Sequence, residues 1–103
     1  GSTAPPLIAA SLDPVAATAL FDALVDDVED MLAQHVVHGD LSPYNILWNG
    51  REHRIIDFPQ AVDARFNSSA RELLERDLGN LASFFERFGE VPDKMGIAAD
   101  MWR

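Results

Sequence analysis

The chain has 103 residues, of which 48% are hydrophobic, with 17 acidic and 8 basic side chains and no cysteine. That length allows one domain or one lobe of a domain, and the lack of cysteine excludes a disulfide framework or a cysteine metal site. The formal charge of −9 argues against direct binding of nucleic acid or an anionic membrane. Because no apolar run approaches the roughly 20 residues of a membrane helix, we expect a cytoplasmic protein without a membrane partner. The chain opens with Gly1-Ser2 and lacks an initiator Met, so we expect it to be a piece of something larger.

The first third of the sequence predicts an extended stretch followed by one long helix. Residues 1–12 are rich in Ala and Pro, and Pro5-Pro6 predicts extended chain without helix there. Asp13-Pro14 is typical of an N-cap followed by proline at the first helical position. From there to about Gln34, apolar residues recur at three- and four-residue spacing, as on one face of an amphipathic helix. They are Leu20, Phe21, Leu24, Val25, Val28, Met31 and Leu32.

The middle of the sequence changes to short β-type runs. Val36-Val37 is the first of them. Ile46-Leu47-Trp48 and Arg54-Ile55-Ile56 lie on either side of the turn signal Asn49-Gly50. Residues 46–58 therefore predict a β-hairpin.

The last third predicts a second helix over roughly residues 69–88, capped by Ser68 or Ser69 and closed by Gly89. We expect a short helix over residues 93–102 as well. Helices, loop and hairpin together predict a mostly helical α+β fold. The buried stripe of the second helix is expected to consist of Leu73, Leu74, Leu78, Leu81, Phe85 and Phe88.

Most of the chemical information lies between His38 and Asp57. Asp40 follows the first β-type run, in a loop where its carboxylate can accept the proton of a substrate hydroxyl. Asn45 begins one hairpin strand and Asp57 ends the other, so antiparallel pairing brings an amide oxygen and a carboxylate to the same end. Two such oxygen ligands suit Mg²⁺, and a carboxylate that ends an apolar strand is costly without a partner. An Asp base with an Asn/Asp metal pair is the phosphoryl-transfer pattern of protein kinases, although turn stabilisation alone would also use these residues.

Three segments resemble the RIO-type atypical serine/threonine protein kinases. His38–Leu47 (HGDLSPYNIL), Ile55–Val62 (IIDFPQAV) and Arg76–Phe85 (RDLGNLASFF) are similar to the catalytic loop, the metal loop and the following helix of that family. Ala4–Leu7 is similar to the stretch just after the family's hinge. The resemblance implies a protein-kinase-like C-terminal lobe over residues 13–103, preceded by a hinge or linker remnant over 1–12.

The same resemblance assigns roles to individual residues. It implies that Asp40 is the catalytic base and that Asn45 and Asp57 bind the Mg²⁺ of Mg²⁺-ATP. Leu47 and Ile56 would lie beneath the adenine as the apolar floor of the nucleotide pocket. Since RIO proteins are described as forming an aspartyl phosphate, Asp57 would also be able to accept phosphate transiently.

Other residues are expected to support this site. Asp77, by the same resemblance, would bond the backbone of the catalytic loop. His38 is expected to prop that loop through its ring nitrogens, whereas His35 and His53 are expected at the surface.

Elements of a complete kinase site are missing from the sequence. No G-x-G-x-x-G occurs, and no lysine precedes Asp40 to neutralise the nucleotide phosphates. Ser42 occupies the position where kinases usually place a lysine against the γ-phosphate. We therefore expect the N-terminal small lobe to precede residue 1 and this fragment to be inactive alone. The complete protein would phosphorylate a protein substrate, itself included, or hydrolyse ATP.

Two other functions are consistent with parts of the sequence. Small-molecule kinases of the aminoglycoside-phosphotransferase type share the H-G-D, Asn and Ile-Asp-Phe elements, although Pro59–Val62 and Arg76–Phe85 favour the RIO family. The other alternative is a non-catalytic interaction module. Phosphorylation of a small amine-rich acceptor would favour the small-molecule kinase. Absence of Mg²⁺-ATP binding would favour the interaction module.

Overall fold

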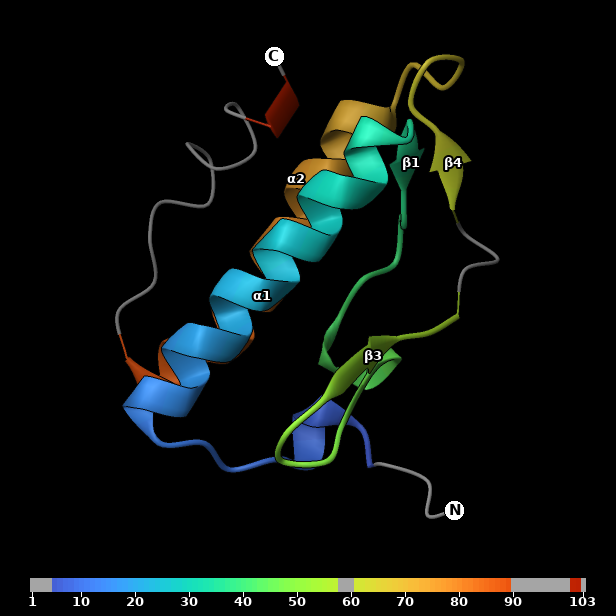
Figure 1. The fold of residues 1–103 in the computed structure, drawn as a ribbon. Coiled ribbons are helices and arrows are strands. Elements are labelled where there is room, and N and C mark those ends of the chain that lie inside the picture. Colours follow the sequence, from blue (N-terminus) through green and yellow to red (C-terminus); the bar gives the residue numbers. More distant parts are fainter. Residues whose placement is uncertain (1–4, 58–60, 90–100, 103) are drawn as a thin grey trace.

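Two long helices lie side by side and two short antiparallel sheets flank them in this computed structural model, which describes residues 5–57, 61–89 and 101–102 (Figure 1). This content confirms the α+β prediction. In chain order the elements are the 3₁₀ turn η1 (Leu7–Ala9), α1 (Pro14–Ala33), β1 (Val36–Val37), the 3₁₀ turn η2 (Pro43–Asn45), β2 (Ile46–Trp48), β3 (His53–Ile55), β4 (Val62–Asp63), α2 (Ala70–Phe85) and the 3₁₀ turn η3 (Glu86–Phe88).

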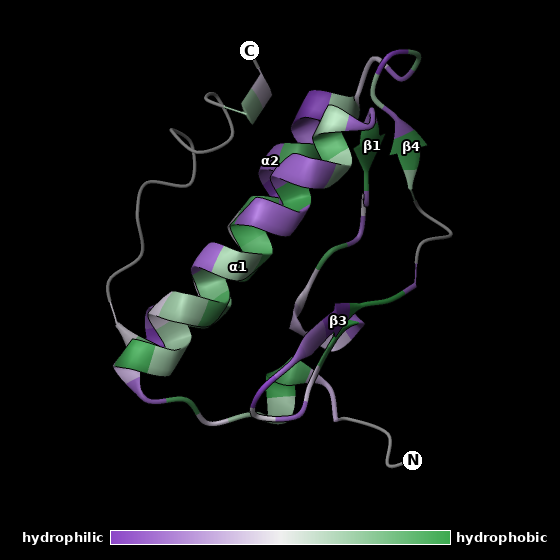
Figure 2. Ribbon diagram, viewed as in Figure 1, coloured by the Kyte–Doolittle hydropathy of each residue, from purple (hydrophilic) through white to green (hydrophobic). Residues whose placement is uncertain are grey.

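Helix α1 begins as the sequence predicts. The Asp13 side chain accepts a hydrogen bond of 2.8 Å from the backbone N–H of Ala16, and Pro14 occupies the first turn. The helix buries one face, and its hydrophilic residues gather on the opposite side of the C-terminal half (Figure 2). Of the predicted stripe, Val25, Met31 and Leu32 are only half-buried. The fully buried residues are Ala17, Leu20, Phe21, Leu24 and Val28.

Helix α2 begins one residue later than predicted and by a different mechanism. Ser69 is the N-cap residue, one of the two positions predicted, but its side chain makes no capping bond. The Asn67 side chain instead accepts a hydrogen bond of 2.8 Å from the Ser69 N–H. Leu73 and Phe88 are half-buried, while Ala70, Ala82 and Phe84 join the predicted core residues Leu74, Leu78, Leu81 and Phe85.

The two helices run in opposite directions and share one hydrophobic core (Figure 1). Phe21 of α1 meets Phe85 of α2 edge to face, with ring centroids 5.3 Å apart. Leu41 and Ile46 enter the same core from the loop and from β2, and both are completely buried. The loop between β1 and β2 is therefore packed directly against the helix pair.

The N-terminal stretch is only partly extended, whereas the sequence predicts extended chain throughout. Pro5 and Pro6 lie along β2, where the Pro5 carbonyl accepts a hydrogen bond of 2.9 Å from the Trp48 N–H. The 3₁₀ turn η1 then begins at Leu7, because proline limits the residues before it and not those after it. Leu7 is fully buried, so this turn completes the core.

The predicted hairpin is confirmed, with Ile46 opposite Ile55 and Trp48 opposite His53. Strand β1 is also confirmed, and it pairs with β4, a two-residue strand that the sequence did not predict. The helix expected over residues 93–102 lies largely outside the described residues; Met101 and Trp102 are helical and pack against the core. No helix within the described ranges is both long and apolar enough to cross a membrane.

Candidate functional site

The loop between β1 and β2 presents Asp40 to solvent. Gly39 enters this bend with φ of 87°, a left-handed conformation that favours glycine. Gly39 and Leu41, the neighbours of Asp40, are buried, but Asp40 itself is exposed. Within the described part of the chain, no residue forms a hydrogen bond to the Asp40 carboxylate. The carboxylate is thus free to accept a proton.

Asp77 of α2 forms hydrogen bonds to the residues on either side of Asp40. Its two carboxylate oxygens accept hydrogen bonds from the N–H groups of Gly39 (2.8 Å) and Leu41 (3.0 Å). Asp77 is only 1% exposed, and burial raises the pKa of its carboxyl against the opposing effect of these two bonds. The prediction that Asp77 bonds the backbone of this loop is confirmed.

His38 joins the loop to the segment that precedes Asp57. Its Nδ1 accepts a hydrogen bond of 3.1 Å from the Asp40 N–H, so the ring proton of the neutral tautomer lies on Nε2. Nε2 donates to the Ile56 carbonyl at 2.8 Å. The predicted structural role of His38 is confirmed.

Asn45 turns its amide group toward the loop. Nδ2 donates a hydrogen bond of 2.6 Å to the Asp40 carbonyl, which leaves Oδ1 with no partner among the described residues. The Ile56 N–H donates to the Asn45 carbonyl at 2.9 Å, so Asn45 and Asp57 lie at the same end of the hairpin. The prediction that both residues belong to strands is wrong: Asn45 ends η2, and Asp57 lies two residues beyond β3.

Asp57 has an uncommon backbone conformation. Its φ of 61° is left-handed, which aspartate tolerates better than most residues and which is often found at functional sites. Its side chain is exposed, so the argument that an unpartnered carboxylate would be costly here, and would therefore favour a metal, is wrong. Within the described ranges, no three His, Cys, Asp or Glu side chains gather as a metal site. Magnesium here would depend on Asn45, Asp57, water and phosphate oxygens.

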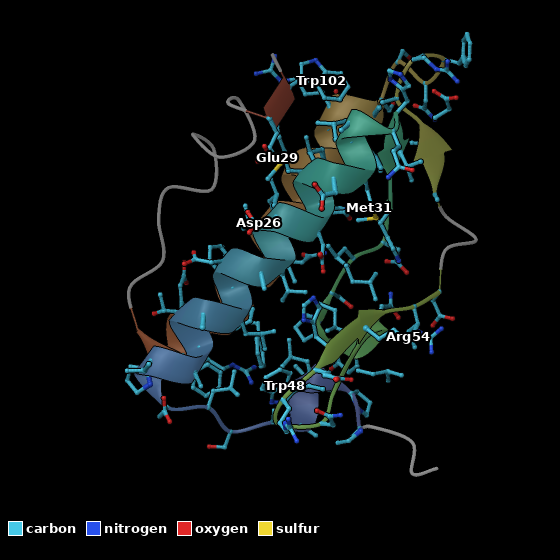
Figure 3. All side chains as sticks on the ribbon, in the orientation of Figure 1. Asp26, Glu29, Met31, Trp48, Arg54 and Trp102 are labelled. Carbon is cyan, nitrogen blue, oxygen red and sulfur yellow. The ribbon has the colours of Figure 1, made fainter. Side chains whose placement is uncertain are left out.

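Leu47 and Ile56 lie on the outer face of the hairpin. Strand alternation turns Ile46 and Ile55 toward the core, and leaves Leu47, its partner Arg54 and Ile56 on the other face. Arg54 accordingly projects away from α1, whereas Trp48 contributes to the core (Figure 3). Half-buried Leu47 and Ile56 thus form a small apolar surface near Asn45 and Asp57.

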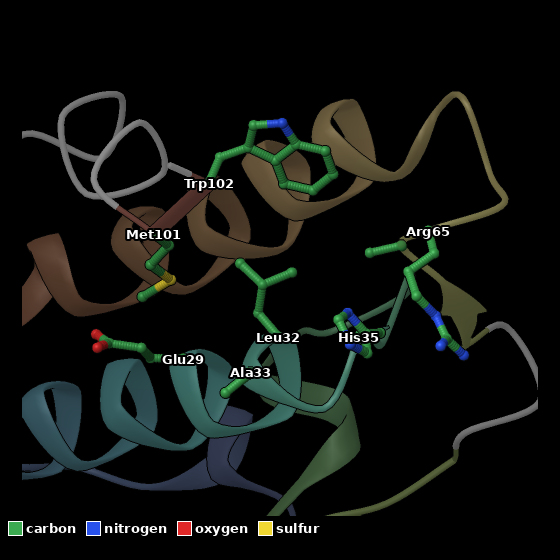
Figure 4. Close-up of a pocket in the computed structure, with 8 residues that line it drawn as sticks. Glu29, Leu32, Ala33, His35, Arg65, Met101 and Trp102 are labelled. Atoms are coloured by element: carbon green, nitrogen blue, oxygen red, sulfur yellow. The ribbon is translucent and has the colours of Figure 1, made fainter.

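Two cavities bear on the location of the site. The larger, of about 560 Å³, lies at the C-terminal end of α1 between Glu29, His35 and Trp102, away from the residues just described (Figure 4). A shallower hollow of about 360 Å³ borders the loop itself, between Ser42, Tyr44 and α2. The chemistry-bearing residues therefore lie outside the larger of these two cavities.

Sequence reasoning missed two polar residues of α2 at this loop. An Nη2 atom of Arg76 donates to the Gly39 carbonyl, and Nδ2 of Asn80 donates to the Leu41 carbonyl at 3.1 Å. Their positions relative to Asp77, one residue before and three after, place all three toward the loop. That spacing was the only signal in the sequence.

The arrangement has the fold of a protein-kinase-like C-terminal lobe. A crystal structure of the Rio2 kinase ADP/Mg²⁺-phosphoaspartate complex from Chaetomium thermophilum superposes with a TM-score of 0.75 and 24% identity, covering 96% of this chain and 34% of that one. The RIO domain family matches residues 2–97. The chain therefore belongs to the RIO domain family, and its relatives are RIO-type serine/threonine kinases.

Two of these relatives match two thirds or more of this chain. The RIO-type serine/threonine-protein kinase Rio1 of Thermoplasma acidophilum is 41% identical over 78 residues, which are 74% of this chain and 41% of that protein. The RIO-type serine/threonine-protein kinase Rio2 of Methanocaldococcus jannaschii is 37% identical over 71 residues, which are 67% of this chain and 26% of that protein. The chain thus spans less than half the length of each of these two relatives.

Proposed function

We propose that this chain is the catalytic lobe of a Mg²⁺-ATP-dependent RIO-type serine/threonine kinase or ATPase. The observation that carries the proposal is the exposed carboxylate of Asp40 in a loop whose backbone is fixed by hydrogen bonds. Side chains bond the backbone of Asp40 itself and the N–H groups of Gly39 and Leu41. A general base must be held in place while its own oxygens remain free. Asp40 meets both requirements and would accept the proton of the attacking hydroxyl or water.

Asn45 and Asp57 would hold the magnesium ion. The bond from Asn45 Nδ2 to the Asp40 carbonyl directs the amide oxygen away from the loop, and both this oxygen and the Asp57 carboxylate lack partners among the described residues. When bound, magnesium would neutralise phosphate charge. The pair fits that ion because magnesium takes one or two protein oxygens and completes its shell with water and phosphates.

The nucleotide base would lie against Leu47 and Ile56. This apolar surface is next to the proposed metal ligands and faces away from the core. No lysine precedes Asp40 in the sequence, so the charge of the α- and β-phosphates would be neutralised by residues of a small lobe outside this chain. We infer that residues 13–103 form the C-terminal lobe, that 1–12 form the connection, and that the lobe is inactive alone.

The acceptor of the phosphoryl group defines the two forms of the proposal. A protein hydroxyl, including one of the same protein, would make the chain part of a kinase, and water would make it part of an ATPase. The Chaetomium Rio2 structure is that of a phosphoaspartate complex, and in this chain the exposed Asp57 carboxylate would be able to form such a group. In that case an Asp57 oxygen would attack the γ-phosphorus, ADP would leave, and water would later release phosphate.

A calorimetric titration with Mg²⁺-ATP tests the proposal. It would compare this chain with the complete natural protein, and each with its Asp57→Asn variant. We expect binding by the complete protein, weaker or no binding by the chain alone, and loss of at least tenfold in affinity in the variant. Asp30→Asn, on the exposed side of α1, serves as the charge-matched control. Absence of binding to the complete protein would overturn the kinase proposal and favour an interaction module.

A further inference from the structure

The backbone conformation of Asp40 depends on the two peptide planes that flank its Cα. One plane contains the Gly39 carbonyl and the Asp40 N–H, and the other contains the Asp40 carbonyl and the Leu41 N–H. Every one of these four groups is bonded to a side chain. The residues that bond the first plane are Arg76 and His38, and those that bond the second are Asn45 and Asp77.

Arg76 is the member of this set to which neither the sequence resemblance nor the proposed chemistry assigns a role. The other three have roles already discussed. Its guanidinium reaches across from α2 to the Gly39 carbonyl, although the residue is exposed and would otherwise be free in solvent. Holding a long, exposed side chain in one conformation costs rotamer entropy. The hydrogen bond to the Gly39 carbonyl must therefore offset that entropy cost.

The peptide between Gly39 and Asp40 is also the one most able to rotate. A flip of this peptide changes ψ of Gly39 and φ of Asp40, and Gly39 has no Cβ that would restrict the change in its ψ. Such a rotation would turn the Asp40 N–H away from His38. Any change in φ of Asp40 that ψ of Gly39 does not compensate would also redirect the Asp40 side chain. The hydrogen bond from Arg76 to the carbonyl of this same peptide opposes that rotation.

Arg76 contributes charge as well as a hydrogen bond. Residues 1–50 contain no Lys or Arg, so positive charge at the loop comes from later in the chain, and Arg76 of α2 places a guanidinium against the Gly39 carbonyl. The positive charge of Arg76 favours the ionised form of Asp77, lowering the pKa that burial raises. The ionised form is the one that accepts hydrogen bonds at both oxygens.

We propose that Arg76 is a positioning residue for Asp40, which locks the Gly39–Asp40 peptide and thereby fixes the direction of the general base. The proposal rests on the proposed function, because it assigns Arg76 a part in the same reaction. Asn80 offers an internal control. It bonds the Leu41 carbonyl, which belongs to the next peptide along the chain and does not define the conformation of Asp40.

The test compares Arg76→Met, Arg76→Gln and Asn80→Ala in the complete natural protein. Backbone hydrogen exchange at the Asp40 N–H reports the peptide directly and needs no activity. We expect exchange at least tenfold faster in Arg76→Met, a smaller increase in Arg76→Gln, which keeps a donor, and little change in Asn80→Ala. Phosphoryl transfer should show a fall in kcat of about tenfold to a hundredfold in Arg76→Met at unchanged KM for ATP, since a base misplaced by about 1 Å loses activity on that scale.

The outcomes separate the two proposals. Phosphoryl transfer by the wild type together with unchanged Asp40 exchange and kcat in Arg76→Met would overturn the positioning role alone. Equal effects of Arg76→Met and Asn80→Ala would also overturn it, because the loop would then respond as a whole. Absence of phosphoryl transfer by the wild type would overturn the proposed function, and the positioning role with it.

Discussion

Nε2 of His38 lies 2.8 Å from the carbonyl oxygen of Ile56, so the loop that carries Asp40 is bonded directly to the segment that carries Asp57. The other ring nitrogen of His38 accepts from the Asp40 N–H. One buried imidazole therefore connects the proposed base and the proposed metal ligand through their backbones. Because the ring bonds both segments at once, a disturbance at either one reaches the other.

Replacing His38 should affect both stability and nucleotide binding. In His38→Phe the ring volume is kept, but the Asp40 N–H and the Ile56 carbonyl lose their partners. We expect the free energy of unfolding to fall by about 1–3 kcal/mol for the unpaired groups, measured by urea denaturation of the chain. Mg²⁺-ATP affinity of the complete protein should fall as well.

The matched control for His38 is the exposed residue His35. It has a left-handed φ of 67°, so His35→Asn keeps a residue type that tolerates this conformation. We expect that variant to change stability by less than about 0.5 kcal/mol, the usual range for surface substitutions. Similar losses in the two variants would contradict a specific bridging role of His38.

Asp40→Asn tests the proposed base without changing its shape. The amide cannot accept the proton, so phosphoryl transfer by the complete protein should fall by about a hundredfold to ten-thousandfold. Nucleotide binding should change little, because Asp40 is not among the proposed metal ligands. Measuring kcat and, by calorimetry, the affinity for Mg²⁺-ATP separates the two effects. Loss of binding with the loss of activity would show that Asp40 has a structural role instead. Asp26→Asn, on α1 (Figure 3), is the control for the lost charge.

Much of the fold could be predicted from local sequence signals. The Asp13-Pro14 cap and the apolar spacing after it define α1, and Asn49-Gly50 defines the hairpin, because each signal acts within a few residues. Strand β4 could not be predicted, since two residues have no periodicity and become a strand only by pairing with β1. The start of α2 was predicted to within one residue, but residue type alone did not reveal that the local bond comes from an Asn67 turn before the helix and not from a serine cap.

Some residues of the candidate site could likewise be predicted from the sequence, whereas others could not. Asp40, Asn45 and Asp57 could be chosen from sequence because their types and spacing form a motif. The contacts of Arg76 and Asn80 with the loop join residues almost forty positions apart and depend on how α2 packs. His53 was expected at the surface, yet it is half-buried, with its Nε2 2.5 Å from a carboxylate oxygen of Asp27 on α1. Such pairings are set by tertiary structure and leave no local signal.

The left-handed conformation of Gly39 makes it a sensitive position. Gly39→Ala would place a Cβ on a residue with φ of 87°, at a cost of about 1–2 kcal/mol in unfolding free energy. Gly50 has a similar φ of 93° in the hairpin turn, with open space where an added methyl group would lie, so Gly50→Ala carries a comparable backbone cost. Urea denaturation should therefore show similar destabilisation in both variants. Only Gly39→Ala should also reduce phosphoryl transfer by the complete protein, and an equal reduction in Gly50→Ala would contradict a local effect at the loop.

The raised pKa of Asp77 predicts the sign of a pH effect on stability. The native carboxyl keeps its proton at pH values where the unfolded one, with its ordinary pKa of 3.8, has lost it, because burial disfavours the charge. The native state then binds more protons, so this group's contribution to the free energy of unfolding falls as the pH rises from below 3.8 to above the raised value. The amide of Asp77→Asn does not titrate. Its NH₂ group would face one of the two loop N–H groups, which then lacks an acceptor, so we expect the free energy of unfolding to fall by about 1–3 kcal/mol.

Urea denaturation of the wild type and Asp77→Asn across this pH range measures the effect. The stability advantage of the wild type should be largest at low pH and should shrink as the pH rises. An NMR titration of the Asp77 carboxyl carbon should have its midpoint above 3.8, whereas Asp63 should titrate near 2, because its hydrogen bonds from Arg65 lower the pKa of that carboxyl to about 2. An advantage that grows with pH would mean that the bonds from Gly39 and Leu41 outweigh burial. Asp77 would then hold the loop as a permanently charged acceptor.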